Sequence, residues 1–152
     1  MKLIYIAHPL VGDGTPEWGN LERNVERYLR FCALFCHAGA AVASWVHHHM
    51  MHSRQLTQGA PPFYLVRDAR LLDGCDALVV AGPPQVSSGV RFEIRHAESR
   101  SIPMWQPLKW MKSEFWPDTG ESAVEKTIPH DLLEFLRSSE TPVRVNTVKE
   151  GK

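Results

Sequence analysis

Two carboxylates flank a turn-rich loop and indicate where this sequence could carry chemistry. Residues 82–89 read GPPQVSSG and run into a segment with helical spacing, in which Glu93 stands four residues after Gly89. Four residues make about one helical turn, so Glu93 can face the same cleft as the loop. Asp68 lies in a helical segment before the preceding apolar run. Paired carboxylates serve glycosyl transfer, where one steadies or attacks the sugar and another group handles the leaving group's proton. The alternative is that both are ordinary solvated helix charges.

The loop itself has the features of an anion site. Ser87, Ser88 and Gly89 stand where the helical segment begins, and a helix N-terminus offers free backbone N–H groups. The pattern is neither GxGxxG nor a P-loop, because no GK[ST] sequence occurs anywhere in the chain. These observations exclude a Walker ATPase and argue against a dinucleotide-binding Rossmann enzyme.

The elements that must position these residues alternate in kind. Apolar runs rich in strand-forming residues predict strands at 3–7, 40–46, 76–81 and 102–105. Helical spacing predicts helices at 21–37, 63–73 and 90–100, and a short final helix that starts at Pro129. Alternating strands and helices imply right-handed βαβ units. We therefore expect a three-layer α/β domain, Rossmann-like or flavodoxin-like, with a parallel sheet of four to five strands. Residues 106–128 receive no assignment.

Length and composition set the class of protein. The 152 residues give room for one domain, expected over residues 1–140 and followed by a C-terminal tail at 141–152. Lys plus Arg and Asp plus Glu are 17 each, and this balance argues against a nucleic-acid polymer as partner. No apolar run reaches the roughly 18 residues of a spanning helix, and the start MKLIYIAHPL does not resemble a signal peptide. Cys32 and Cys36 are expected to be buried thiols, not a disulfide. The expectation is a reduced, cytoplasmic protein without a membrane partner.

The edge of the sheet adds further candidates. In open parallel sheets, ligands bind beyond the carboxyl ends of the strands, which points to the loops that begin at His8, Ser44 and Gly82. His8 is therefore a candidate binding residue. The histidines at 47–49 and 52 follow the second strand, but consecutive residues cannot all point one way and no acidic or cysteine partner stands nearby. We interpret them as a polar loop or as a stacking surface for a base, and we expect no metal site.

The residues from 67 to 103 resemble the core of the nucleoside 2-deoxyribosyltransferase superfamily. In that family an Asp begins a short helix and a second Asp opens an apolar strand eight residues later. A G-x-x-x-E-[LI]-x-x-A signature follows. Here the matching residues are Asp68, Asp76 with ALVV, and GVRFEIRHA with Glu93. The first strand, LIYIAHPL, is similar to the family's opening strand and places Tyr5 where the family has a Tyr near its catalytic Glu. The resemblance covers roughly residues 2–105 with one long gap, and it extends to small uncharacterised phage and bacterial relatives.

The resemblance implies a mechanism. Glu93 would attack the anomeric carbon of a 2-deoxyriboside, Asp68 would protonate the departing base or hold it, and Tyr5 would orient Glu93. A second base would resolve the glycosyl ester in a transferase, and water would do so in a hydrolase. Asp76 is expected to anchor its strand. Neither a metal nor an organic cofactor is needed, because carboxylates alone carry covalent glycosyl chemistry. The alternative functions are a catalytically silent nucleotide-binding module on the same fold and a purely structural or partner-binding α/β domain.

One branch of the resembled superfamily hydrolyses 2'-deoxynucleoside 5'-monophosphates. It reads Q-P-S-x-G-V-G-Y-E where this chain has QVSSGVRFE, and the serine that matches Ser87 holds the phosphate. This similarity favours a nucleotide over a free nucleoside. The loop after the first strand lacks the arginine of that branch, and Arg91 replaces a small residue. Arg91 would either supply the missing charge or crowd the pocket.

The aromatic segment 105–116 has two interpretations. It forms part of the core or of a subunit interface, or it provides an aromatic wall over a base. The resemblance implies a homo-oligomer in which neighbouring subunits complete each other's active sites, with a small-molecule nucleoside or nucleotide as the ligand.

Overall fold

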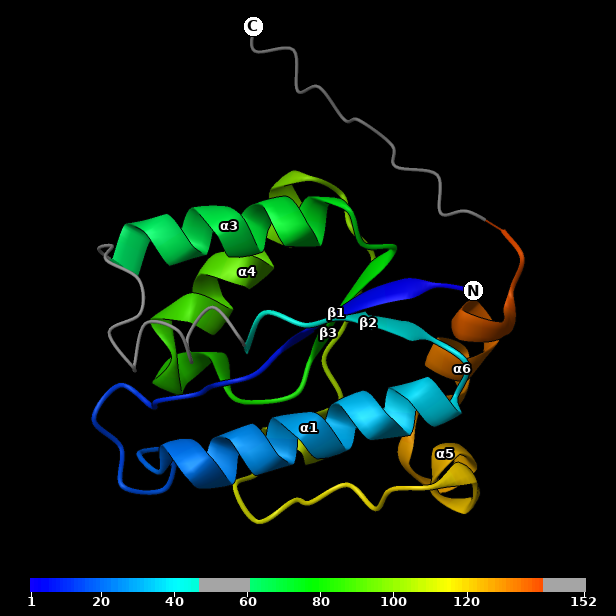
Figure 1. The fold of residues 1–152 in the computed structure, drawn as a ribbon, viewed down its shortest axis with the longest axis horizontal. Helices are drawn as coiled ribbons and strands as arrows, with labels where there is room; N and C mark the ends of the chain where they lie inside the picture. The colour runs from blue at the N-terminus through cyan, green and yellow to red at the C-terminus, as the bar shows by residue number, and fades with distance from the viewer. Residues whose placement is uncertain (47–60, 141–152) are drawn as a thin grey trace, which may run out of the picture.

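The computed structural model describes residues 1–46 and 61–140, and a parallel sheet forms its centre (Figure 1). The sheet has four strands in the order β2-β1-β3-β4, and every pair is parallel. The strands are β1 (Leu3–Ala7), β2 (Ala41–Ala43), β3 (Ala77–Val80) and β4 (Met104–Trp105). The prediction of a parallel α/β sheet is confirmed.

Helices cover both faces of this sheet and make three layers (Figure 1). Helices α3 (Pro61–Asp73) and α4 (Ser88–Ser99) lie side by side on one face. Helix α1 (Leu21–His37) lies on the other face with α5 (Glu121–Thr127) beside it. Helix α6 (His130–Arg137) lies near the start of β1, where the ammonium group of Lys2 is 5.0 Å from the ring centre of Phe135. None of the helices described for this chain combines the length and apolarity needed to cross a membrane.

The two central strands are buried because both faces of the sheet are covered. The side chains of Ile4, Ile6 and Val79 have no exposed surface, as the continuous apolar runs predict. Asp76 Oδ2 accepts a hydrogen bond of 2.7 Å from the Leu3 N–H, which joins the start of β3 to the start of β1. The predicted anchoring role of Asp76 is therefore confirmed.

Helix α1 follows its sequence signals at both ends. Its N-cap, Asn20, accepts a hydrogen bond of 2.9 Å from the Arg23 N–H. The chain leaves the helix through Gly39, whose φ of 84° lies in the left-handed region that favours glycine. Phe31 and Phe35 on its buried face contact Trp110, which is fully buried. These contacts confirm the core interpretation for that tryptophan.

Several element boundaries differ from the predicted ones. β2 covers residues 41–43 and not 40–46; beyond its end the Ile6 carbonyl of β1 accepts a hydrogen bond of 2.7 Å from the Trp45 indole N–H. Helix α3 begins at Pro61, since proline needs no N–H partner in the first helical turn. The unassigned stretch 106–128 contains α5 and a 3-10 turn, η2 (Leu108–Met111). The histidines at 47–49 and 52 and the tail at 141–152 lie outside the described residues.

All three cysteines are free thiols, as predicted. Cys75 is buried, and Cys32 is partly buried. Cys36, however, is exposed, so its expected burial is wrong. The side chain at this position of α1 points away from the sheet, because the buried stripe of the helix passes through Phe31, Leu34 and Phe35.

Candidate functional site

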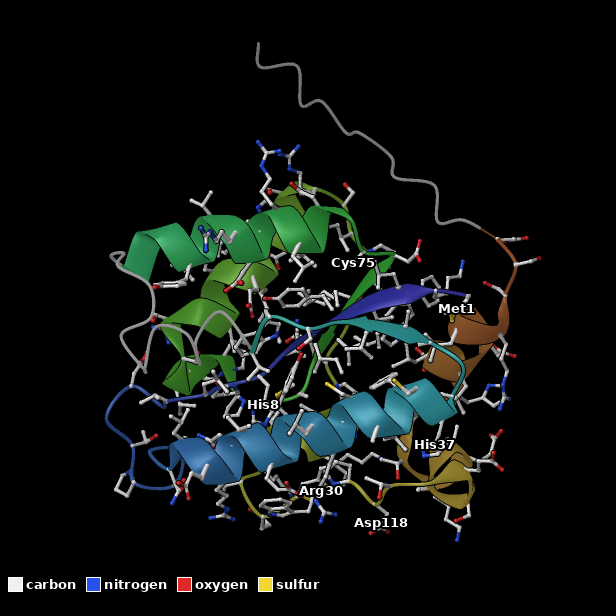
Figure 2. All side chains as sticks on the ribbon, viewed as in Figure 1. Met1, His8, Arg30, His37, Cys75 and Asp118 are labelled. Atoms are coloured by element: carbon white, nitrogen blue, oxygen red, sulfur yellow. The ribbon has the colours of Figure 1, made fainter. Side chains whose placement is uncertain are left out.

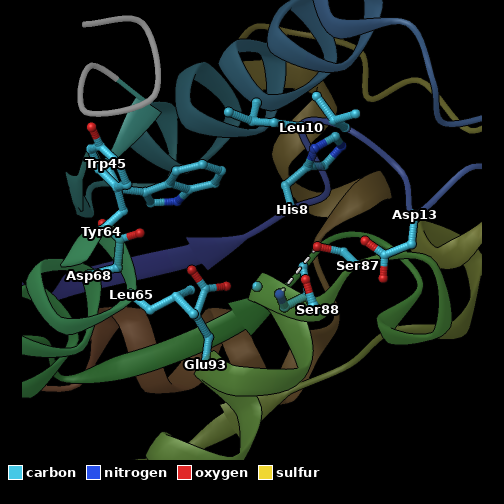
Figure 3. A pocket seen from close by; sticks show the side chains of 13 residues that line it. His8, Leu10, Asp13, Trp45, Tyr64, Leu65, Asp68, Ser87, Ser88 and Glu93 are labelled. Atoms are coloured by element: carbon cyan, nitrogen blue, oxygen red, sulfur yellow. Dashed lines mark hydrogen bonds between the residues drawn. The ribbon is translucent and has the colours of Figure 1, made fainter. Parts of the chain in front are cut away.

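A cavity of about 270 Å³ opens at the carboxyl edge of the sheet (Figure 3). Segments that follow β1, β2 and β3 contribute to its walls, together with α3 and the start of α4. The lining residues are His8, Leu10, Val11, Asp13, Trp45, Tyr64, Leu65, Asp68, Ser87, Ser88, Gly89, Val90 and Glu93. This is the edge where parallel sheets bind ligands, and the volume is near the lower end of small-molecule sites.

Glu93 and Tyr5 form a buried pair at this cavity. The Tyr5 hydroxyl, from the central strand β1, donates a hydrogen bond of 2.6 Å to Glu93 Oε1, from α4. Burial raises the pKa of Glu93 to about 8, and the negative charge of Asp68 adds to the rise, while the Tyr5 hydrogen bond opposes it. Burial also raises the pKa of Tyr5 well above its usual value, so the phenol keeps its proton. The contact predicted from the family resemblance is present.

Asp68 completes a cluster of two carboxyl groups. It is buried on α3 and lines the cavity. Its charge raises the pKa of both Glu93 and Tyr5, so it lies close enough to interact with each. Two interacting carboxyl groups in a buried site retain one proton at neutral pH, since ionising both is costly.

The first turn of α4 forms another wall of the cavity. Ser87 is the N-cap of this helix, and its Oγ accepts a hydrogen bond of 3.3 Å from the Val90 N–H. Its hydroxyl proton therefore remains able to donate to a ligand. Ser88 and Gly89 also line the cavity, and N–H groups in the first helical turn have no partner within the helix. All three predicted residues of this loop are placed together.

His8 also lines the cavity and is almost fully buried. Its ring contacts Trp18, Tyr28 and Phe31, with centroids 5.8, 6.3 and 6.2 Å away. Burial, and then the positive charge of Arg27, lower the pKa of His8 to about 3, so the imidazole is neutral. Neither ring nitrogen has a hydrogen-bond partner within the described part of the chain. A buried polar group of this kind can accept or donate a hydrogen bond to a bound molecule.

Two predicted site residues, Tyr5 and Arg91, are not among the lining residues; Tyr5 is joined to the cavity through Glu93, whereas Arg91 is engaged elsewhere. Its Nη1 donates to the carbonyls of Pro84 and Gln85, both at 2.9 Å. Its Nη2 lies 3.1 Å from Asp13 Oδ2. These bonds fix the guanidinium to the loop before α4 and to the loop after β1.

Seven lining residues are not predicted from the sequence, and three of these carry a charged or aromatic side chain: Asp13, Trp45 and Tyr64. Trp45 stands at the carboxyl edge of β2, in a loop that the strand-end rule indicated. Tyr64 precedes Asp68 by four residues, so helical spacing places both on one face of α3. Asp13 lies in the loop after β1, and no local pattern distinguishes it from other polar loop residues.

The aromatic wall of the cavity is formed by Trp45 and Tyr64 and not by the segment 105–116. The Trp105 indole instead donates to Asp131 Oδ2 (2.8 Å). Trp116 lies next to Arg23 and Arg30, whose guanidinium carbons are 5.7 and 5.5 Å from its ring centre.

Comparisons of the chain with models of protein families, with curated proteins and with solved structures find no match. Within residues 1–46 and 61–140, no group of three or more His, Cys, Asp and Glu side chains could hold a metal ion.

Proposed function

We propose that this protein cleaves or transfers the N-glycosidic bond of a (2-deoxy)nucleoside or of its 5'-monophosphate. The observation that carries the proposal is the Glu93 carboxyl, buried at the cavity wall, held by the Tyr5 hydroxyl at 2.6 Å, and placed near the carboxyl group of Asp68. The resemblance of residues 67–103 to the nucleoside 2-deoxyribosyltransferase superfamily supports the same conclusion.

The chemistry uses one proton shared by the two carboxyl groups. When the sugar binds, this proton resides on Asp68 and Glu93 is ionised. An Oε atom of Glu93 forms a bond to the anomeric carbon as the carbon–nitrogen bond breaks, and Asp68 gives its proton to the departing base. Water or a second base then attacks the anomeric carbon, the bond from this carbon to Glu93 breaks, and the Asp68 carboxylate takes up the proton that the attacking molecule loses. Tyr5 holds the carboxylate through its hydrogen bond in both steps.

The remaining walls suit the two parts of a nucleoside. Trp45 and Tyr64 offer aromatic surfaces on which a base can stack. Ser87, the first-turn N–H groups of α4 and the neutral ring of His8 offer hydrogen bonds to the hydroxyl groups of a sugar.

The test is chromatography of the free base released from 2'-deoxynucleosides and their 5'-monophosphates, with and without an acceptor base. Glu93→Gln and Asp68→Asn are expected to lose release by at least a hundredfold, on the scale of a lost acid–base or nucleophilic group. Glu98→Gln, an exposed position on the same helix, is the matched control and should retain full release. Absence of base release by the wild-type protein, at protein concentrations equal to substrate, would contradict the proposal.

A silent nucleotide-binding module is the second candidate function. The raised pKa of Glu93 favours it, because a carboxyl that is neutral at pH 7 can bind an uncharged ligand without reacting. In that case the wild-type protein binds a nucleoside without releasing base. Glu93→Gln then keeps the affinity, since an amide replaces a neutral carboxyl closely.

A further inference from the structure

The described residues that line the cavity include three acidic side chains and no lysine or arginine. Asp13, Asp68 and Glu93 are all at its walls. His8 adds no positive charge, because its pKa is about 3. A phosphate monoester carries a charge of about −1.5 to −2 at pH 7. The described lining side chains therefore offer such a group no cationic partner, and Asp13 and the remaining charge of the Asp68–Glu93 pair disfavour it.

Two arginines that interact with lining residues, Arg91 with Asp13 and Arg27 with His8, already donate hydrogen bonds elsewhere. Arg91 is paired with Asp13 and donates to two backbone carbonyls, and it is not a lining residue. Arg27 lies behind His8, where its Nε and Nη2 donate to the carbonyls of Phe115, Trp110 and Lys112. In this arrangement both arginines are bonded to backbone carbonyls, and neither side chain lines the cavity.

Asp13 stands next to the part of the cavity that would attract an anion. Its N–H donates a hydrogen bond of 2.6 Å to the Val86 carbonyl, which fixes the residue beside the start of α4. Its side chain lines the cavity together with Ser87 and Ser88 (Figure 3). A helix N-terminus carries a partial positive charge, and a carboxylate held beside it compensates that charge.

We propose that Asp13 makes this site selective for uncharged nucleosides over nucleoside 5'-monophosphates. The inference rests on the proposed function, since it assigns the substrate class of the same cavity. Asp13 acts as a specificity-determining residue: its carboxylate disfavours a phosphate group at the start of α4, where a sugar hydroxyl can still bind. The family resemblance alone favours a nucleotide over a free nucleoside. A comparison of the two affinities therefore distinguishes the two expectations.

The experiment measures the affinity of each 2'-deoxynucleoside and its 5'-monophosphate by titration calorimetry at pH 7.5 and low salt. The wild-type protein is expected to bind nucleosides at least tenfold more tightly than the monophosphates, because like charges in a partly desolvated site repel strongly. Asp13→Asn keeps the shape of the side chain and removes its charge. This variant should gain about tenfold or more in affinity for the monophosphates, with little change for the nucleosides.

Asp118→Asn is the matched control, because it removes the same charge from an exposed position far from His8 (Figure 2). Its selectivity should equal that of the wild-type protein. Added salt should reduce the wild-type selectivity, since it screens charges that solvent reaches. The side chain of Asp13 is 42% exposed, so Asp13→Asn is expected to fold, and its thermal unfolding temperature verifies this.

Two outcomes would overturn the inference in different ways. In the first, monophosphates bind at least as tightly as nucleosides, and Asp13→Asn leaves the ratio of the two affinities unchanged. This result would overturn the role of Asp13 but leave the proposed function standing. No binding of any nucleoside or monophosphate to any variant would overturn both.

Discussion

The chemistry of Glu93 depends on what surrounds it and not on the residue type alone. Burial and the charge of Asp68 raise its pKa to about 8, while the Tyr5 hydroxyl stabilises the ionised form. These opposing effects leave the pKa for the last proton of the carboxyl pair near neutral. The proposed acid and nucleophile need a pKa in this range. The sequence identifies these three residues through the resemblance, but the pKa follows only from their burial and contacts.

Tyr5→Phe tests this balance. It removes the hydrogen bond to Glu93 and should raise the pKa of Glu93 above 8 by about one unit or more, since hydrogen bonds to charged groups contribute about 1.5–3 kcal/mol. Carbon-13 NMR of labelled glutamate carboxyl groups measures the shift. In the proposed reaction the alkaline limb of the pH–rate profile moves to higher pH by the same number of pH units. Tyr28→Phe, a buried tyrosine that does not bond to Glu93, is the control, and an equal shift in both variants would contradict the assignment.

At the scale of the elements, two strand ends must approach closely to form the edge of the cavity. Gly82 follows β3, and a Cβ atom built there would lie 2.3 Å from Cδ of Pro9, which follows β1. The loop after β3 can pass the loop after β1 only if residue 82 has no side chain. The position of His8, the neighbour of Pro9, therefore depends on a glycine in another loop.

Gly82→Ala is expected to destabilise the protein by about 1–3 kcal/mol, the range for overpacking in a close-packed interior. Chemical denaturation measures the loss. Gly74→Ala is the matched control, because its Cβ would meet its nearest neighbour, the Leu71 carbonyl oxygen, at an ordinary 3.4 Å. Equal stability of the two variants would show that the loop after β1 adapts without cost.

Helix α4 depends on its N-cap residue, Ser87, for both its stability and its contribution to the site. Ser87→Ala removes the side chain that accepts from the Val90 N–H and should cost about 1 kcal/mol of stability. Ser99→Ala, at the exposed last residue of the same helix, should change stability by less than about 0.5 kcal/mol. Thermal denaturation of both variants measures the difference, and a loss confined to Ser99→Ala would contradict the capping role.

At the scale of the whole molecule, two buried groups give the stability a defined pH dependence. The pKa of Glu93 rises from an ordinary 4.5 to about 8 on folding, so the stability that this group contributes is lost as pH rises from 4.5 to 8. The pKa of His8 falls from an ordinary 6.5 to about 3, so its contribution is lost as pH falls from 6.5 to 3. Between pH 4.5 and 6.5 the two slopes oppose each other and cancel.

These two groups therefore predict a plateau of stability between about pH 4.5 and 6.5, with a decrease on either side. Each slope is at most about 1.4 kcal/mol per pH unit, the value for one proton. Glu93→Gln should flatten the alkaline side, and His8→Gln the acid side. Denaturant unfolding of the three proteins across pH 3–9 measures this. An alkaline slope that Glu93→Gln leaves unchanged would contradict the assignment for Glu93.

The sequence by itself determined the alternation of strands and helices, the parallel sheet, and the order in which Tyr5, Asp68 and Glu93 follow along the chain. Local signals sufficed there, because the period of apolar residues, the Asn20 cap and the buried run of β3 act over a few neighbouring residues. The end of β2 was misjudged; beyond it, a long-range hydrogen bond joins Trp45 to β1.

Only the tertiary structure decided what lines the cavity and how its charges are arranged. Arg91 and Asp13 lie 78 positions apart, and their pairing brings a carboxylate to the cavity and keeps the guanidinium out of it. Trp45 and Tyr64 line the cavity because β2 ends beside it and α3 begins beside it. Contacts of this kind depend on how the layers pack in three dimensions, and no pattern of neighbouring residues encodes them.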